Sequence, residues 1–145
     1  MQDASQVIVV DAANVVGSRP DGWWRDRAGA ARRLLGELGA LRTRLPGSTR
    51  IIVVLEGAAK AAADRGGDGH AADGESGSDG SAGVRVVLAG GSGDDTIVEV
   101  VAAEVGGSDP MPAITVVTAD RGLRARVESL GATTVGPGWL RNHLS

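Results

Sequence analysis

Acidic side chains follow each of four short apolar runs along the chain. The segments are Asp11-Ala12-Ala13-Asn14, Glu56-Gly57, Ser92-Gly93-Asp94-Asp95 and Thr118-Ala119-Asp120-Arg121. If the runs are parallel strands, these acids meet beyond the carboxyl ends of the strands, where open α/β sheets carry their sites. Crowded carboxylates repel one another and raise each other's pKa, and a bound cation relieves this repulsion. The spacing therefore predicts a cation site built from oxygen ligands.

Magnesium and manganese are the ions that suit such a site, because both are hard cations that prefer oxygen ligands. Two such ions can hold the attacking and the leaving oxygen of a phosphodiester. The chain has no cysteine, which excludes a disulfide scaffold, a thiolate zinc site and a cysteine nucleophile. Its two histidines, His70 and His143, are poorly placed for zinc. We therefore expect Mg²⁺ or Mn²⁺ as the cofactor.

A purely structural role is an alternative for each of these acids. The residues that could serve as helix caps, helix-start charges or turn formers are Asp11, Glu56, Asp94, Asp95 and Asp120. Glu99 lies four residues after Asp95 on the same helix face, so it is either a further ligand or a solvated surface residue. The metal hypothesis is favoured because all four strand ends carry an acid.

Other residues near the expected edge could bind substrate. Asn14 could hold Asp11 or a phosphate, or could be an ordinary turn residue. Ser92 belongs to a glycine-rich segment before a helix, where backbone amides could meet a phosphate. Neither the Walker pattern nor the dinucleotide glycine pattern is present, which gives a nucleotide cofactor little support.

Three further side chains suit a nucleic-acid substrate. Arg19 and Arg121 are candidates for holding phosphate through the guanidinium group. Trp23 could stack on a base, or it could instead cover the start of a helix.

The elements that must position these residues are visible in the hydrophobic pattern. Strands are predicted for the apolar runs 7–10, 51–55, 84–88 and 114–117, and a weaker one for 133–135. Helices are predicted from about Trp24 to the stop at Pro46-Gly47, over 94–105, from Asp120 to Gly131, and around Trp139. This alternation predicts an α/β fold, a three-layer α/β/α sandwich with a mainly parallel sheet, as a single domain over 1–145.

Residues 64–83 form a segment of a different kind. They include 7 glycines and carry a net charge of −4, so they are predicted to be a flexible acidic insertion loop. Without them the formal charge changes from −3 to +1, which neither implies nor excludes a nucleic-acid partner. No apolar run approaches a membrane span, and the first residues lack the basic region of a secretory signal. A cytoplasmic location without membrane attachment is expected.

The three motifs together resemble a known family. The segments around Asp11 and Asn14, around Asp95 and Glu99, and around Asp120 are similar to those of the NYN branch of the PIN-like nucleases, in particular the YacP-like group. The resemblance spans most of the chain apart from the acidic loop. It implies a PIN-like α/β/α fold, acidic residues that bind Mg²⁺ or Mn²⁺, and cleavage of RNA.

The function expected from the sequence is therefore metal-dependent phosphodiester hydrolysis by a ribonuclease. The resemblance assigns the metal to Asp11, Asp95 and Asp120, with Asp94, Glu99 or Glu56 completing the shell. Asn14 and Arg121 would position the phosphate. Two alternatives stay open: a phosphohydrolase of free nucleotides that uses the same site, and a catalytically silent module that binds RNA or a protein. A protein partner or a homodimer is compatible with all of these.

Overall fold

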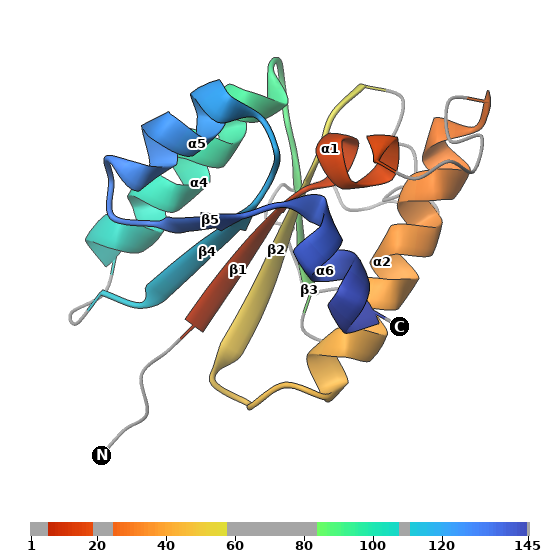
Figure 1. Ribbon diagram of the computed structural model, residues 1–145, viewed down its shortest axis with the longest axis horizontal. Helices are drawn as coiled ribbons and strands as arrows, with labels where there is room; N and C mark the ends of the chain where they lie inside the picture. The colour runs from red at the N-terminus through yellow and green to blue at the C-terminus, as the bar shows by residue number, and fades with distance from the viewer. Residues whose placement is uncertain (1–5, 19–24, 58–83, 108–110, 145) are drawn as a thin grey trace.

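The β-branched apolar runs form one sheet in which every strand pairing is parallel. The computed structural model describes residues 6–18, 25–57, 84–107 and 111–144. Its strands are β1 (Gln6–Asp11), β2 (Thr49–Leu55), β3 (Val84–Leu88), β4 (Ala113–Val117) and β5 (Thr133–Val135). Their order across the sheet is β3-β2-β1-β4-β5 (Figure 1). All five predicted strands are confirmed, including the short β5.

Helices cover both faces of this sheet. They are α1 (Ala12–Gly17), α2 (Arg27–Thr43), α4 (Gly93–Gly107), α5 (Arg121–Glu128) and α6 (Pro137–Leu144). One face carries α1, α2 and α6, and the opposite face carries α4 and α5 (Figure 1). The predicted three-layer α/β/α sandwich is thus confirmed.

The core consists of two apolar clusters, one on each side of the sheet. Alternate residues of a strand point to opposite faces, and β1 shows this directly. Its Ile8 and Val10 pack toward α2, whereas Val7 and Val9 pack toward α4. A strand buried on both faces needs an uninterrupted apolar sequence, which explains the run at 7–10. Leu140 of α6 is fully buried, as expected for a last helix that packs on the sheet.

The helices differ from the sequence prediction in one respect. The six-residue helix α1 was not predicted, and Asn14 lies within it rather than in a loop. Six residues are too few for a hydrophobic period to be recognised. The apolar face of α2 is centred on Leu34, which is fully buried, whereas Leu35 is only partly buried. Trp24, predicted to begin this face, lies outside the described residues.

The order of the strands creates a crevice beside β1. The chain runs from β1 outward to β2 and β3, then returns to the other side of β1 for β4 and β5. The connection that leaves β1 and the connection that returns to β4 therefore lie on opposite faces of the sheet. Ligands of such sheets bind where this reversal occurs, which here is between β1 and β4. The insertion loop at 64–83 lies outside the described residues. Within the described ranges, no helix is both long and apolar enough to span a bilayer.

Candidate active site at the carboxyl ends of the strands

Strand alternation places three polar side chains on the same face of the sheet. Residues of β1, β2 and β4 that face α4 and α5 are Val7 and Val9, Ile52 and Val54, and Ile114 and Val116. The next positions in these three series are Asp11, Glu56 and Thr118. Gly57 follows with φ of 60°, a left-handed conformation that lets the chain turn directly after Glu56. The apolar pattern of the strands thus brings these polar groups together.

Asp11 is the most buried acid of this group, with 7% of its surface exposed. Its Oδ2 accepts a hydrogen bond of 2.9 Å from the Thr118 hydroxyl, and its Oδ1 accepts one of 3.4 Å from the Asn14 backbone N–H. Burial raises the pKa of Asp11 to about 6, and the nearby Asp94 and Glu56 carboxylates add to the rise. The two hydrogen bonds act in the opposite direction. The surroundings of Asp11 therefore disfavour the charged form of its carboxyl group.

A network of short polar contacts joins β1 to β4 across the crevice. The Thr118 hydroxyl, which donates to Asp11, accepts the backbone N–H of Asp120 at 3.1 Å. The Asn14 side-chain oxygen accepts the backbone N–H of Ala119 at 2.8 Å. Asp120 in turn caps α5, since its Oδ1 accepts the N–H of Leu123 at 2.9 Å. The capping role considered for Asp120 is confirmed.

Asp94 and Glu56 complete an acidic cluster with Asp11 and Asp120, and we call these four residues the acidic edge. The pKa of Asp94 is raised, first by partial burial and then by the charges of Asp120 and Glu56. The Glu56 carboxylate lies against Gly93 so closely that a Cβ at this position would collide with it. Gly93 therefore lets the start of α4 approach the end of β2.

Asp95 and Glu99, two further ligands expected from the sequence, lie on the exposed side of α4. The Asp95 side chain is 65% exposed and forms an ion pair of 3.0 Å with Arg126 of α5. Glu99, one turn later, is exposed on the same side of α4. Burial of Ile97 and Val101 turns the helix so that Asp94, rather than Asp95, reaches the other acids.

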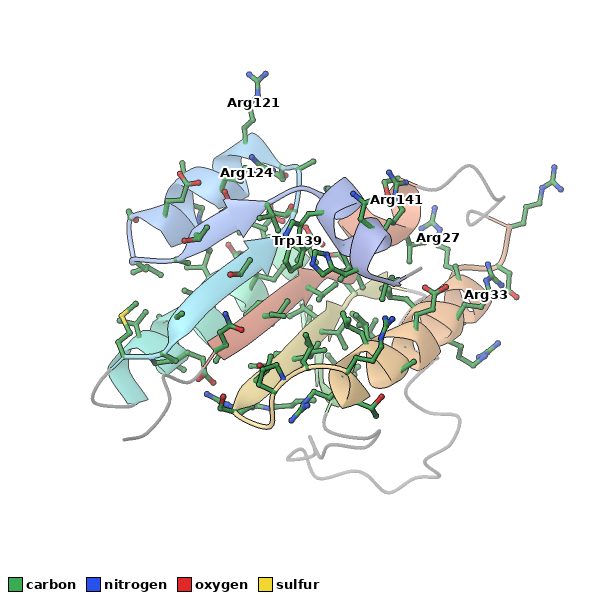
Figure 2. The ribbon with its side chains drawn as sticks, turned by 60° about the horizontal axis from the view of Figure 1, so that its bottom comes forward. Arg27, Arg33, Arg121, Arg124, Trp139 and Arg141 are labelled. Carbon is green, nitrogen blue, oxygen red and sulfur yellow. The ribbon has the colours of Figure 1, made fainter. Side chains whose placement is uncertain are left out.

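The expected substrate-binding residues have varied surroundings. The Ser92 hydroxyl caps α4 by accepting the Asp95 backbone N–H at 3.2 Å. Arg121 is exposed and extends away from the body of the protein (Figure 2). Its neighbour Arg124 donates Nε–H to the Thr118 carbonyl at 2.9 Å, so it supports the network instead. Arg19 and Trp23 lie outside the described residues.

Thr118 is the site residue that the sequence reasoning missed. It is fully buried, and its hydroxyl joins Asp11 to Asp120. A threonine directly after an apolar strand looks like the end of that strand. Counting alternate positions from Ile114 and Val116 would have placed it beside Asp11.

The acidic edge can be judged as a metal site by its donor chemistry. Its donors are all oxygen atoms, and burial, with a further contribution from the neighbouring carboxylates, raises the pKa of Asp11 and of Asp94. Both properties suit a hard divalent cation. Within the parts of the chain that the structure describes, no three acidic or histidine side chains are already arranged to hold an ion. Coordination would therefore require rotation of at least the more exposed side chains.

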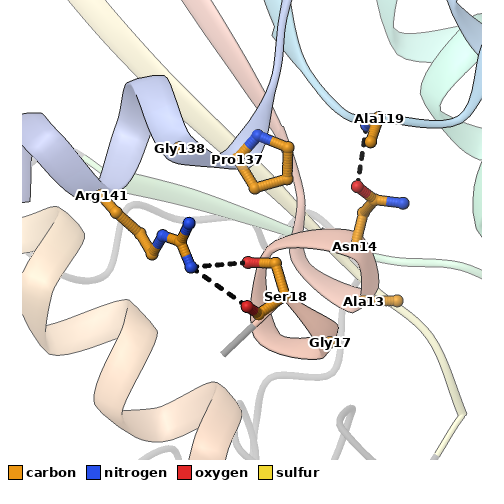
Figure 3. Close-up of a pocket in the computed structure, with 8 residues that line it drawn as sticks. All are labelled: Ala13, Asn14, Gly17, Ser18, Ala119, Pro137, Gly138 and Arg141. Carbon is orange, nitrogen blue, oxygen red and sulfur yellow. Dashed lines mark hydrogen bonds between the residues drawn. The ribbon is translucent and has the colours of Figure 1, made fainter. Parts of the chain in front are cut away.

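A pocket of about 490 Å³ lies beside the acidic edge on the α1 and α6 side. It is lined by Ala13, Asn14, Gly17, Ser18, Ala119, Pro137, Gly138 and Arg141 (Figure 3). Asn14 and Ala119 are shared with the polar network described above. The pocket and the acidic edge are therefore neighbours, joined at Asn14.

Comparison with known proteins bears on the fold. No protein-family model matches the chain, and no curated protein matches it in sequence. A crystal structure of Rae1 (YacP) from Bacillus subtilis is similar, with a TM-score of 0.60 and 16% sequence identity. The alignment covers 95% of this chain and 73% of the Bacillus protein. At this identity the likeness shows the fold, and it confirms at that level the resemblance to the YacP-like group.

Proposed function

We propose that this protein is a metal-dependent nuclease that cleaves RNA at the acidic edge. The observation that carries the proposal is the convergence of Asp11, Glu56, Asp94 and Asp120 beside the crevice between β1 and β4. Sites of open parallel sheets form at this place. The structural likeness to YacP supports a nuclease, and the motifs that resemble the NYN branch support RNA as the substrate.

The acidic residues have a common role in this proposal. Asp11, Asp94 and Asp120, with Glu56, hold one or two Mg²⁺ or Mn²⁺ ions. A bound ion supplies neutralisation of the charge that develops on the phosphate during hydrolysis. Asp11 and Asp120 are fixed by their capping bonds, so these two carboxylates are held in place before any ion arrives. Glu56 and Asp94 adjust around them.

Asn14 and Thr118 act as positioning residues. The Asn14 side-chain oxygen accepts the Ala119 N–H, which fixes the orientation of the amide group. The amide nitrogen is then available to donate to a phosphate oxygen. The Thr118 hydroxyl fixes one oxygen of Asp11. Orientation of this kind contributes to rate because it holds the reacting groups in position before the reaction.

The test is a cleavage assay with two classes of substrate. Purified protein is incubated with labelled single-stranded RNA and, separately, with nucleoside triphosphates, in Mg²⁺, Mn²⁺ or EDTA. Asp11→Asn and Asp120→Asn are compared with Glu128→Gln, a control that removes a carboxylate bonded to Thr134 at the far end of α5. We expect metal-dependent RNA cleavage that both aspartate variants lose and the control keeps.

Other outcomes would replace the proposal. Hydrolysis of nucleoside triphosphates without cleavage of RNA would make the protein a nucleotide phosphohydrolase. Metal binding without turnover of either substrate would make it a silent module that binds RNA or a protein. Full RNA cleavage by Asp120→Asn would refute the assignment of the acidic edge.

A further inference from the structure

The pocket beside Asn14 is a hollow made by small residues. Ala13, Gly17, Ala119 and Gly138 lie around it, and none of them has a side chain larger than a methyl group. The ring of Pro137 forms another part of the wall (Figure 3). Its volume of about 490 Å³ falls within the usual range for small-molecule sites and exceeds what a single anion would fill. It is also widely open, so a ligand could extend beyond it.

The polar groups of the pocket are held in fixed positions. Arg141 of α6 donates from Nη1 to the Ser18 carbonyl at 3.1 Å and to the Ser18 hydroxyl at 3.4 Å. These bonds connect α6 to the end of α1 and hold the guanidinium at the rim (Figure 3). On the opposite side, Asn14 is oriented by its bond from Ala119. The two side chains therefore face the hollow from different helices.

The charge of this pocket contrasts with that of the acidic edge. Among the residues that the structure describes, its lining contains the positive charge of Arg141 and no carboxylate. A guanidinium presents a planar fork of donors that matches phosphate oxygens. Asn14 lies at the boundary, since its backbone N–H reaches Asp11 and its side chain lines the pocket. A chain of phosphodiesters that crosses Asn14 would thus meet acids on one side and a cation on the other.

We infer that this pocket binds the nucleotide next to the phosphodiester that is cleaved, with its phosphate on Arg141 and its sugar against the small-residue wall. The inference rests on the proposed nuclease function. It adds a substrate contact on α6, which none of the acidic motifs includes. It also explains why the pocket is open, because a polymer must leave it at both ends.

Binding can be tested without catalysis. Uridine 5′-monophosphate is titrated into ¹⁵N-labelled protein in EDTA, and amide signals are followed by NMR. We expect shifts of the Ser18, Ala119 and Gly138 signals, and binding about tenfold or more weaker in Arg141→Gln, since a hydrogen bond to a charged group is lost. Arg44→Gln is the matched control, because Arg44 donates to the His143 carbonyl at the other end of α6. It should bind like the wild type.

A second variant covers the case in which loss of Arg141 disturbs the fold. Gly138→Leu leaves Arg141 and Ser18 unchanged and fills the hollow. The position accepts a side chain, because a Cβ there has only an ordinary contact of 3.8 Å with the Arg141 guanidinium. We expect it to abolish the shifts and to raise KM for RNA with little change in kcat, because it removes a contact that is made equally in the ground state and in the transition state.

The outcomes separate this inference from the proposed function. Absence of nucleotide shifts at Ser18, Ala119 and Gly138, or unchanged binding by a folded Gly138→Leu, would overturn the pocket assignment even if RNA is cleaved. An equal loss of binding in Arg44→Gln would also overturn it. Conversely, shifts at these residues in a protein that cleaves no RNA would retain a nucleotide pocket and refute the nuclease.

Discussion

Charged side chains are paired at the amino edge of the sheet and crowded together at its carboxyl edge. At the amino edge, Arg50 of β2 forms two hydrogen bonds with Glu104 of α4, at 2.7 and 3.3 Å. At the carboxyl edge, burial raises the pKa of Asp11 and of Asp94, and neighbouring acids add to the rise. Pairing at one edge supports the fold, whereas crowding at the other opposes it. The carboxyl edge is therefore where a cation would change the energy of the protein most.

The crowded acids are nevertheless well anchored. Asp11 caps α1 and Asp120 caps α5, so the two helices keep their first residues close to the crevice. Each cap stabilises its own helix while adding one more negative charge to the same small region. The local preference of the chain and the electrostatics of the site thus conflict, as is common where a protein carries function.

Activity should give the largest difference between neighbouring acids. Asp94→Asn is expected to lower RNA cleavage by more than about 100-fold, since even outer-shell partners of metal ligands contribute 10–100-fold. Asp95→Asn is expected to change it by less than about fivefold, because its side chain pairs with Arg126 outside the acidic edge. Initial rates at saturating Mn²⁺ measure both. The reverse ranking would restore Asp95 to the site.

Stability should reveal the strain on Asp11 directly. The pKa of Asp11 is about 6 in the folded protein against 3.8 for an ordinary aspartate, so the folded state holds the additional proton between these values. The free energy of unfolding therefore falls as pH rises through this window, and the loss is complete above about pH 6. Asp11→Asn removes the charge and should raise stability at pH 8 by up to about 3 kcal/mol.

Thermal unfolding in EDTA at pH 4 and pH 8 measures this effect. The gain from Asp11→Asn should be large at pH 8 and small at pH 4, where Asp11 is protonated in the folded state. A variant that is less stable than the wild type at pH 8 would show that the Thr118 and Asn14 bonds outweigh the cost of burial. The crowding at the carboxyl edge would then be harmless to the fold.

Gly93→Ala tests whether the close approach of α4 holds Glu56 in place. The new methyl group would meet the Glu56 carboxylate, which is the flexible end of a long side chain and should swing away. We expect the pKa of Asp11 and of Asp94 to fall, as both are raised by Glu56, with a stability change of about 1 kcal/mol or less. Gly106→Ala, with open space at its Cβ, is the control in the same helix.

The carboxyl ¹³C signals of Asp11 and Asp94, followed through a pH titration, report these two pKa values. Unchanged values in Gly93→Ala would mean that Glu56 keeps its position and that Gly93 serves only the packing of α4.

The smallest effect is expected at the amino edge. A double-mutant cycle with Arg50→Gln and Glu104→Gln should give a coupling of about 1 kcal/mol or less, because Arg50 is half-exposed and salt screens the pair. Chemical denaturation measures this coupling, and RNA cleavage should remain at the wild-type level. A marked loss of cleavage would show that the two edges are not independent.

The sequence predicted the sheet and the meeting of acids at its edge, because both follow from local rules. Runs of β-branched residues identified the strands, and a parallel sheet gathers the residues after each strand. The sequence preference for Asp95 over Asp94 relied on the spacing to Glu99. The buried positions Ile97 and Val101 favour Asp94 instead, since they share a helix face with it.

Other features depend on tertiary contacts that no single segment contains. The helix α1 is too short to show a period and begins where Asp11 caps it. The pocket arises only when the end of α1, the residue after β4 and the start of α6 meet. Its lining residues are small, and small residues give little signal in a sequence because they are common on every kind of surface.

The buried hydroxyl of Thr118 links Asp120 to Asp11 through two consecutive hydrogen bonds. Since it accepts the Asp120 N–H, its single proton is left to point at Asp11, and the two bonds run in series from the first turn of α5 to the end of β1. Bonds in series polarise one another, so negative charge on Asp11 strengthens the bond at Asp120. Serine could replace this relay, but valine, although similar in shape, would interrupt it. The Thr118 oxygen therefore couples the end of β1 to the start of α5, alongside the bond between Asn14 and Ala119.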